Sequence, residues 1–258
     1  MSESNKRNFI VHGSILAIAG ILVRIIGMLY RIPVVNIIGS EGNGIYGAAF
    51  NIYNIMLVLS SYGLPMAVSK LVSARFTKKR YKSAAKVLRC SLMVAVCTGG
   101  IAALLVFFGA SFIENVIYGG GLPGLAVPLR ILAPTIFLVA ILGVIRGFFQ
   151  GQSTMIPTAV SQILEQIVNA IVSIAAGYGM MKAFASLPDV AAYGAAGSTL
   201  GTAMGALTAV LFMGFLYAVY TPTFNRLKRK DRHTENQSTG QICKIIILSL
   251  IHISEPTR

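Results

Sequence analysis

Six long apolar segments, separated by short polar turns, constrain this chain more than any other feature. Each is long enough to cross a hydrocarbon core of about 30 Å as an α-helix. Hydrophobic residues make up 55% of the chain and charged residues only 12%, which excludes an ordinary soluble domain. The sequence predicts an all-α integral membrane protein with a six-helix lobe over residues 9–220. The segments cover about 9–30, 45–68, 90–112, 125–149, 157–184 and 191–220.

The positive charges predict how this lobe is oriented. The formal charge of +14 gathers in short runs, chiefly Lys70–Arg89 and Thr221–Gln241. The loops after the third and fifth segments instead carry the acids Glu114 and Asp189 and no base. By the positive-inside rule, the basic loops and residues 1–8 lie in the cytoplasm. This topology explains the charge without nucleic acid, although Lys70–Arg89 would also suit anionic lipid head groups.

Reactive residues give no sign of catalysis or of a bound metal. Cys90, Cys97 and Cys243 have neither a disulfide pattern nor metal-ligand spacing, and the histidines are scattered. The run Gly119–Gly121 is not a phosphate-binding loop, because it lacks the lysine that ends such a motif. We therefore expect a transporter rather than an enzyme, with no catalytic residue, metal or cofactor.

A polar face runs along the fifth segment. Ser161, Glu165, Asn169 and Ser173 recur every four residues and so lie on one side of a helix. A carboxylate near the middle of a bilayer costs a few kcal/mol or more unless it is protonated, paired or hydrated. Glu165 is therefore a candidate functional residue, for ion coupling or as a charge partner, with Asn169 beside it. The alternative is that Glu165 only holds neighbouring helices together.

Two arginines stand seven residues apart in the first segment. Arg24 and Arg31 are separated by two helical turns and can share a face. Arg31 lies near a membrane interface, which its long side chain can reach. Arg24 is deeper, so it either binds an anion in a cavity or pairs with Glu165, with an extended side chain as the lesser alternative.

The second segment is predicted to follow a helix break at the loop Gly39–Gly44. It carries Asn51 and Asn54 at helical spacing, which either pack against neighbouring helices or contribute to a polar cavity. Gly63 and Pro65 predict a bend farther along the segment.

Glycines predict where helices approach closely. Small residues spaced by four let helix backbones come together in a membrane. Two such series occur, one in the fourth segment and one in the sixth: Gly143 and Gly147, and Gly197, Gly201 and Gly205.

The C-terminal part is predicted to be a basic linker over 221–241, followed by the start of a seventh helix at 242–247. The last residues, SLIHISEPTR, resemble the translated read-through of a sequencing adapter. We therefore expect 248–258 to be non-native and the chain to be the front part of a longer protein.

Three stretches together resemble a known transporter family. They are AIAGILVRIIGMLYRIPVVNIIGSEGNGIYG, SSYGLPMAVSKLVS and LRILAPTIFLVAILGVIRGFFQGQSTMIPTAVSQILEQIVN. In order and spacing they resemble polysaccharide-type flippases of the multidrug, oligosaccharidyl-lipid and polysaccharide exporter superfamily. Within it they are most similar to the stage V sporulation protein B and Firmicutes lipid II flippase group.

This resemblance implies the first lobe of a two-lobed flippase in the bacterial cytoplasmic membrane. The expected cargo is an undecaprenyl-linked saccharide, such as lipid II or a polysaccharide repeat unit. Arg24 matches a position that binds pyrophosphate in such proteins, and Arg31 matches a second one only approximately. Coupling to sodium, protons or membrane potential is implied, and membrane lipid and wall-synthesis enzymes are possible partners. The alternatives are a multidrug or cation efflux antiporter of the same superfamily and a non-transport scaffold for wall-synthesis enzymes.

Overall fold

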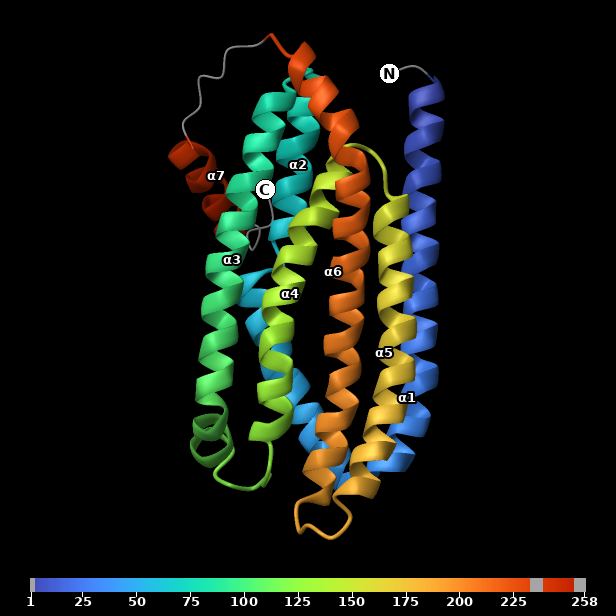
Figure 1. Ribbon diagram of the computed structural model, residues 1–258, viewed down its shortest axis with the longest axis vertical. Helices are drawn as coiled ribbons and strands as arrows, with labels where there is room; N and C mark the ends of the chain where they lie inside the picture. The colour runs from blue at the N-terminus through green and yellow to red at the C-terminus, as the bar shows by residue number, and fades with distance from the viewer. Residues whose placement is uncertain (1–2, 233–238, 253–258) are drawn as a thin grey trace.

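The structure, a computed structural model, describes residues 3–232 and 239–252 and is helical nearly throughout (Figure 1). The prediction of an all-α membrane protein is confirmed. Five helical stretches of the described residues are long and apolar enough to span a membrane, and the first, Ser14–Thr77, is long enough to do so twice. The elements are α1 (Glu3–Ser60), α2 (Leu64–Thr77), α3 (Tyr81–Phe112), the π-helical turn η1 (Ile113–Ile117), α4 (Ala126–Gly151), α5 (Ile156–Ala183), α6 (Val190–Lys230) and α7 (Thr239–His252).

Helix α1 folds back on itself at one glycine. Gly39 has φ 69° and ψ −175°, a conformation that only glycine adopts without strain. The chain reverses there, and the second leg of α1 runs obliquely back behind α6 and α4 towards α2 (Figure 1). The predicted break is therefore a kink at Gly39 and not a loop over Gly39–Gly44, because helix resumes immediately afterwards.

The second crossing bends where the sequence predicted it. Ser61–Gly63 form a turn, and Pro65 lies in the first turn of α2, where its missing N–H costs no helical hydrogen bond. With α3, α4, α5 and α6, the two legs of α1 give an antiparallel bundle with the basic turns at one end (Figure 1).

Helix α6 continues through the predicted linker as far as Lys230, which corrects the expected boundary at 221. Phe224 is only 1% exposed. Its ring stacks on Phe76 of α2 with centroids 6.1 Å apart and meets Phe148 of α4 at 5.4 Å. Burial of this aromatic ring stabilises the extra helical turns although Pro222 lies among them.

The connection between α3 and α4 is fixed by a carboxylate. Glu114 accepts hydrogen bonds from the backbone N–H groups of Gly124, at 3.0 Å, and Ala126, at 2.7 Å. Ala126 is the first residue of α4 and Gly124 lies two residues before it, so these N–H groups have no acceptor within the helix. Glu114 therefore stabilises the N-terminal end of α4.

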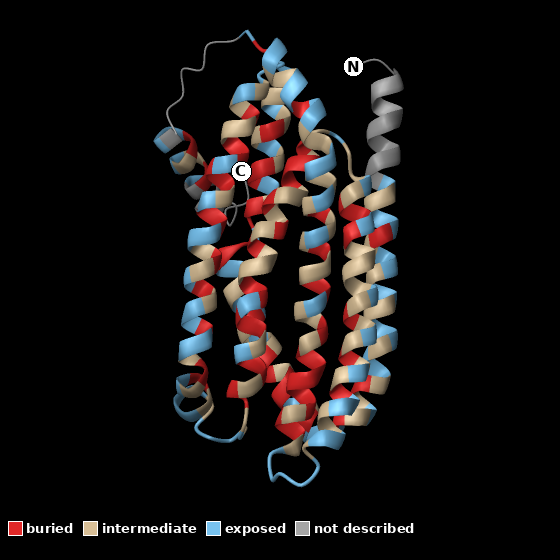
Figure 2. Ribbon diagram, viewed as in Figure 1, coloured by how far each residue is buried: buried red, intermediate tan, exposed pale blue. Residues whose placement is uncertain are grey.

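The exterior of the bundle is apolar. Buried residues lie mostly on the inner sides of the helices, and exposed ones form stripes along α1 and α3 (Figure 2). The exposed side chains include large apolar ones such as Phe108, at 76%. Such a surface suits lipid rather than water.

The predicted C-terminal pieces are only partly described. Helix α7 begins at Thr239 and so includes the predicted start of the seventh helix at 242–247. Of the predicted non-native tail, residues 253–258 lie outside the described residues.

Candidate functional site

An ion pair links α4 and α5 inside the bundle. Arg146 Nη2 lies 2.8 Å from Glu165 Oε2, and the two side chains are 14% and 27% exposed. Arg146 Nε also donates to the Ser161 hydroxyl at 2.9 Å. Glu165 therefore has a compensating charge, and its partner is Arg146 rather than the predicted alternative, Arg24.

Asn169, one turn beyond Glu165, joins three helices. Its side-chain N–H₂ group donates to the Tyr30 hydroxyl of α1 at 3.2 Å. Its carbonyl oxygen lies 2.9 Å from the Ser173 hydroxyl and 3.4 Å from the Thr202 hydroxyl of α6. These contacts form two separate groups, which meet successive turns of the same face of α5. We call the two groups together the polar seam: Tyr30, Arg146, Ser161, Glu165, Asn169, Ser173 and Thr202.

Arg24 lies on α1 near the polar seam but does not join it. Gly27, one turn after Arg24, faces Gln166 of α5 at 3.1 Å from the position of a Cβ, so α1 and α5 are in close contact here. The Arg24 side chain is exposed. Among the described residues, none lies within hydrogen-bond or ion-pair distance of it. Arg24 is thus a cation in a membrane-spanning leg without a counter-charge from the described chain.

Arg31 connects the two legs of α1. Its guanidinium lies 5.0 Å from the centre of the Tyr46 ring, and Nη2 is 3.4 Å from Asn43 Oδ1. Both partners are uncharged, so the positive charge of Arg31 remains available to an anion. Two helical turns separate Arg31 from Arg24, and both side chains are exposed, as their predicted common face requires.

Asn51 and Asn54 lie on the returning leg of α1 and are both exposed. Beside them, Phe50 contacts Tyr46 and Tyr53 through its ring, and both tyrosines are buried. The aromatic residues of this leg therefore face the bundle, whereas the two amides face outward.

The two glycine series lie at close helix contacts. A Cβ on Gly205 would lie 2.6 Å from the Glu165 carbonyl oxygen, and one on Gly201 would meet Ser173 and the Asn169 backbone. Gly197 faces Ala176 in the same way, so α5 and α6 touch along their backbones. In α4, Gly143 and Gly147 face Pro65 of α2, with the Pro65 carbonyl 2.5 Å from a Cβ on Gly147.

Sequence reasoning missed the role of Arg146, which lies near the end of α4 and pairs with Glu165. The available signal was one base and one acid in adjacent apolar segments, each needing compensation. Tyr30 and Thr202 gave no such signal, because a single hydroxyl in an apolar helix is unremarkable. Among the described residues, no group of three or more His, Cys, Asp or Glu side chains is placed to hold a metal ion.

Comparison with known proteins gives a consistent assignment. The family model described as Polysaccharide biosynthesis protein matches residues 10–250. Lipid II flippase MurJ of Bacillus subtilis (strain 168) is 34% identical over 176 residues, 66% of this chain and 32% of that protein. Stage V sporulation protein B of the same strain is 31% identical over 253 residues, 98% of this chain and 46% of that protein. The chain thus spans less than half the length of these relatives.

Solved structures agree on the fold. A crystal structure of MATE in complex with MaD3S aligns with a TM-score of 0.70 at 16% identity, covering 92% of this chain and 52% of that one. A MOP superfamily transporter from Pyrococcus furiosus aligns with a TM-score of 0.67 at 17% identity, covering 92% and 51%. At these identities the likeness concerns the fold, which is that of a MATE-like transporter. With the family match over residues 10–250, the chain belongs to the polysaccharide biosynthesis protein family.

Proposed function

We propose that this chain forms one lobe of a flippase that moves undecaprenyl-linked saccharides, such as lipid II or a polysaccharide repeat unit, across the cytoplasmic membrane. The observation that supports this most strongly is Arg24, an exposed guanidinium in a membrane-spanning leg without a counter-charge from the described residues. A cation in that position requires water or an anion. The lipid II flippase MurJ and stage V sporulation protein B are relatives of the chain.

The chemistry of such a cargo fits the exposed face of α1. A lipid-linked pyrophosphate has a head group that hydrocarbon excludes and a tail that hydrocarbon retains. Its carrier needs a hydrated, cationic surface that is open sideways to lipid. Arg24 and Arg31 offer planar donors for phosphate oxygens, and Asn51 and Asn54 offer amides for sugar hydroxyls.

The polar seam has a separate role in this proposal. Glu165 pairs with Arg146 and fixes α5 against α4. The polar seam is thus the scaffold that positions the cationic face of α1, which we define as the exposed face that carries Arg24 and Arg31. Coupling to sodium, protons or membrane potential would act on this ion pair, because Glu165 is the acid in it and would bind a cation or proton once Arg146 moved away.

The proposed orientation places the basic end of the bundle and the N-terminus in the cytoplasm. Membrane lipid and the lipid-linked saccharide are the expected partners, and wall-synthesis enzymes would meet the protein at its basic turns. In this role the chain is a carrier and not an enzyme.

Genetic rescue tests the proposed function. The full-length protein that carries this sequence is expressed in a bacterium depleted of its own lipid II flippase. We expect the wild type to restore growth and Arg24→Ala to fail at equal expression, with partial rescue by Arg24→Lys, which retains the charge but not the bidentate geometry.

Arg130→Gln is the matched control, because Arg130 is also an exposed arginine in an apolar helix and donates a hydrogen bond to the uncharged Ser111 hydroxyl at 2.8 Å. Full rescue by Arg24→Ala would contradict the proposed role of this residue. Failure of the wild type, together with export of organic cations, would favour efflux. Rescue by proteins that lack both Arg24 and Glu165 would favour a scaffold.

A further inference from the structure

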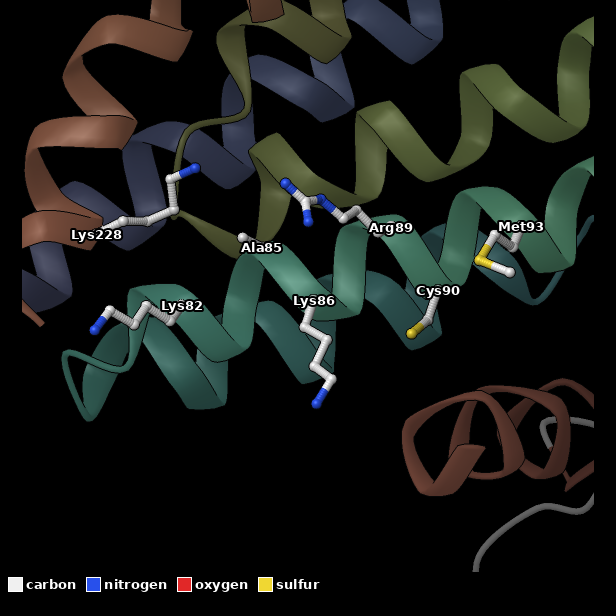
Figure 3. Close-up of a pocket in the computed structure, with 7 residues that line it drawn as sticks. All are labelled: Lys82, Ala85, Lys86, Arg89, Cys90, Met93 and Lys228. Atoms are coloured by element: carbon white, nitrogen blue, oxygen red, sulfur yellow. The ribbon is translucent and has the colours of Figure 1, made fainter. Parts of the chain in front are cut away.

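A basic pocket that shares no lining residue with the polar seam lies between α3 and the end of α6 (Figure 3). Its volume is about 420 Å³. It lies near the end of the bundle that holds the basic turns, and α3 and the first leg of α1 are at opposite edges of the bundle (Figure 1). Its lining residues are Lys82, Ala85, Lys86, Arg89, Cys90, Met93 and Lys228.

The charge of this basic pocket is strongly unbalanced. Four of its lining residues are bases and none is an acid. Arg89 of α3 and Lys228 of α6 extend into the space between the two helices (Figure 3). One acid lies at the border, where Asp231 accepts a hydrogen bond from the backbone N–H of Lys82 at 2.8 Å. The surroundings therefore remain cationic, and an anion is the complementary ligand.

The bases of α3 continue into an apolar track. Lys82, Lys86, Arg89 and Met93 are spaced by four, three and four residues and so form one stripe along α3. Farther along the same side, Met93, Val96 and Leu104 are 60%, 46% and 58% exposed. Gly100 adds no side chain to this surface. The stripe thus changes from cationic to apolar in the direction that leads from the end of the bundle towards its middle.

This order of charge and apolar surface matches a phospholipid. An anionic head group at the membrane interface lies next to bases, and its acyl chain extends into the hydrocarbon core. A soluble phosphate would use the bases but not the apolar track. The two features together favour a lipid as the occupant.

We propose that the basic pocket binds the head group of an anionic glycerophospholipid, with its phosphate between Arg89 and Lys228 and an acyl chain along Met93, Val96 and Leu104. The bound lipid is a constituent of the membrane and not the transported cargo. The assignment of this lipid to the cytoplasmic leaflet rests on the proposed orientation of the protein. The binding of the lipid itself does not depend on that orientation.

The test uses fluorescence quenching in nanodiscs. The chain contains no tryptophan, so Val96→Trp provides a reporter on the apolar track, with any tryptophan elsewhere in the full-length protein replaced by phenylalanine. Phosphatidylglycerol with brominated acyl chains is titrated against brominated phosphatidylcholine. We expect brominated phosphatidylglycerol to reach half-maximal quenching at a mole fraction at least about fivefold lower than brominated phosphatidylcholine.

Two sets of substitutions separate the basic pocket from general surface charge. The pocket variant carries Lys82→Gln, Lys86→Gln, Arg89→Gln and Lys228→Gln. The control variant carries Lys78→Gln, Lys79→Gln, Arg226→Gln and Arg229→Gln, which remove the same charge from exposed residues outside the lining. We expect the preference for phosphatidylglycerol to disappear in the pocket variant and to persist in the control.

The proposal would be overturned if the pocket variant and the control variant lost the preference for phosphatidylglycerol equally. Equal quenching of the wild type by the two lipids would also overturn it. Relief of quenching by inorganic phosphate would overturn the lipid as occupant and assign the site to a soluble anion. If the pocket variant does not fold, as judged by its helical content, the double variant Lys86→Gln and Arg89→Gln replaces it. Because the readout is lipid binding, failure of flipping does not affect it.

Discussion

At the scale of single residues, the main question in an apolar bundle is how each charge is compensated. Glu165 and Arg146 compensate one another across α4 and α5, and Ser161 gives the arginine a second acceptor. Arg24 has no such partner among the described residues. The same principle therefore separates them in the proposed function: the paired charges hold the helices together, and the unpaired charge of Arg24 is the one proposed to bind an anion.

Breaking the pair from one side should destabilise the bundle. Glu165→Ala leaves the Arg146 guanidinium largely buried without its carboxylate, and we expect a loss of roughly 1–3 kcal/mol. Replacing both partners by apolar residues, Arg146→Met with Glu165→Leu, should recover most of that loss. Thermal unfolding in detergent measures both.

Glu41→Gln is the control for loss of an acid, because Glu41 is exposed on α1. Equal stability of Glu165→Ala and Glu41→Gln would contradict the structural role assigned to the ion pair.

At the scale of helices, packing depends on glycines at the α5–α6 contact. We expect Gly201→Ala to destabilise the protein by about 1–3 kcal/mol, because its Cβ would overlap Ser173 and the α5 backbone. Gly214→Ala, on the same helix, has no neighbour within 4 Å of the added Cβ. It should be neutral or stabilising by up to about 1 kcal/mol, since alanine favours helix. The comparison of their apparent melting temperatures tests this contact, and equal effects would contradict it.

The helices themselves could be predicted from the sequence because lipid imposes one requirement on every segment. Each crossing must be apolar, helical and about 20 residues long. That requirement located α4 and α5 to within one residue at their starts, at Ala126 and Ile156. The break in α1 was predicted as a loop over Gly39–Gly44, whereas the structure has a kink at Gly39 alone. The sequence does not distinguish the two, because one glycine with positive φ can reverse the chain as a loop does.

Contacts between helices could not be predicted in this way. The extension of α6 depends on Phe224 meeting Phe76 and Phe148, which are distant in sequence. The choice of Arg146 over Arg24 as the partner of Glu165 depends on how each helix is rotated about its axis. Periodicity shows which residues share a face, but it does not show which neighbouring helix that face meets.

At the scale of the whole molecule, the two ends of the bundle differ in charge. The turn Lys78–Arg80 and the end of α6 are at one end (Figure 1). The turn after α5 includes Asp189 and is at the other. This asymmetry supports the proposed orientation, with the basic end in the cytoplasm.

Cysteine labelling measures this orientation directly. With Cys90, Cys97 and Cys243 replaced by serine, we expect a cysteine at Ser186 to react with a membrane-impermeant maleimide on intact cells. A cysteine at Lys79 should react only after permeabilisation. The reverse pattern would contradict the proposed orientation.

The central claim is that the cationic face of α1 binds an anionic lipid-linked cargo, and equilibrium binding tests it most directly. The full-length protein in nanodiscs is titrated with an undecaprenyl-pyrophosphate saccharide, for the wild type, Arg24→Ala and Arg130→Gln. Because one charge-assisted contact contributes about 1.5–3 kcal/mol, we predict binding at least about tenfold weaker for Arg24→Ala and unchanged for Arg130→Gln. Equal affinity of wild type and Arg24→Ala for this cargo, or preferential binding of an organic cation, would contradict the account.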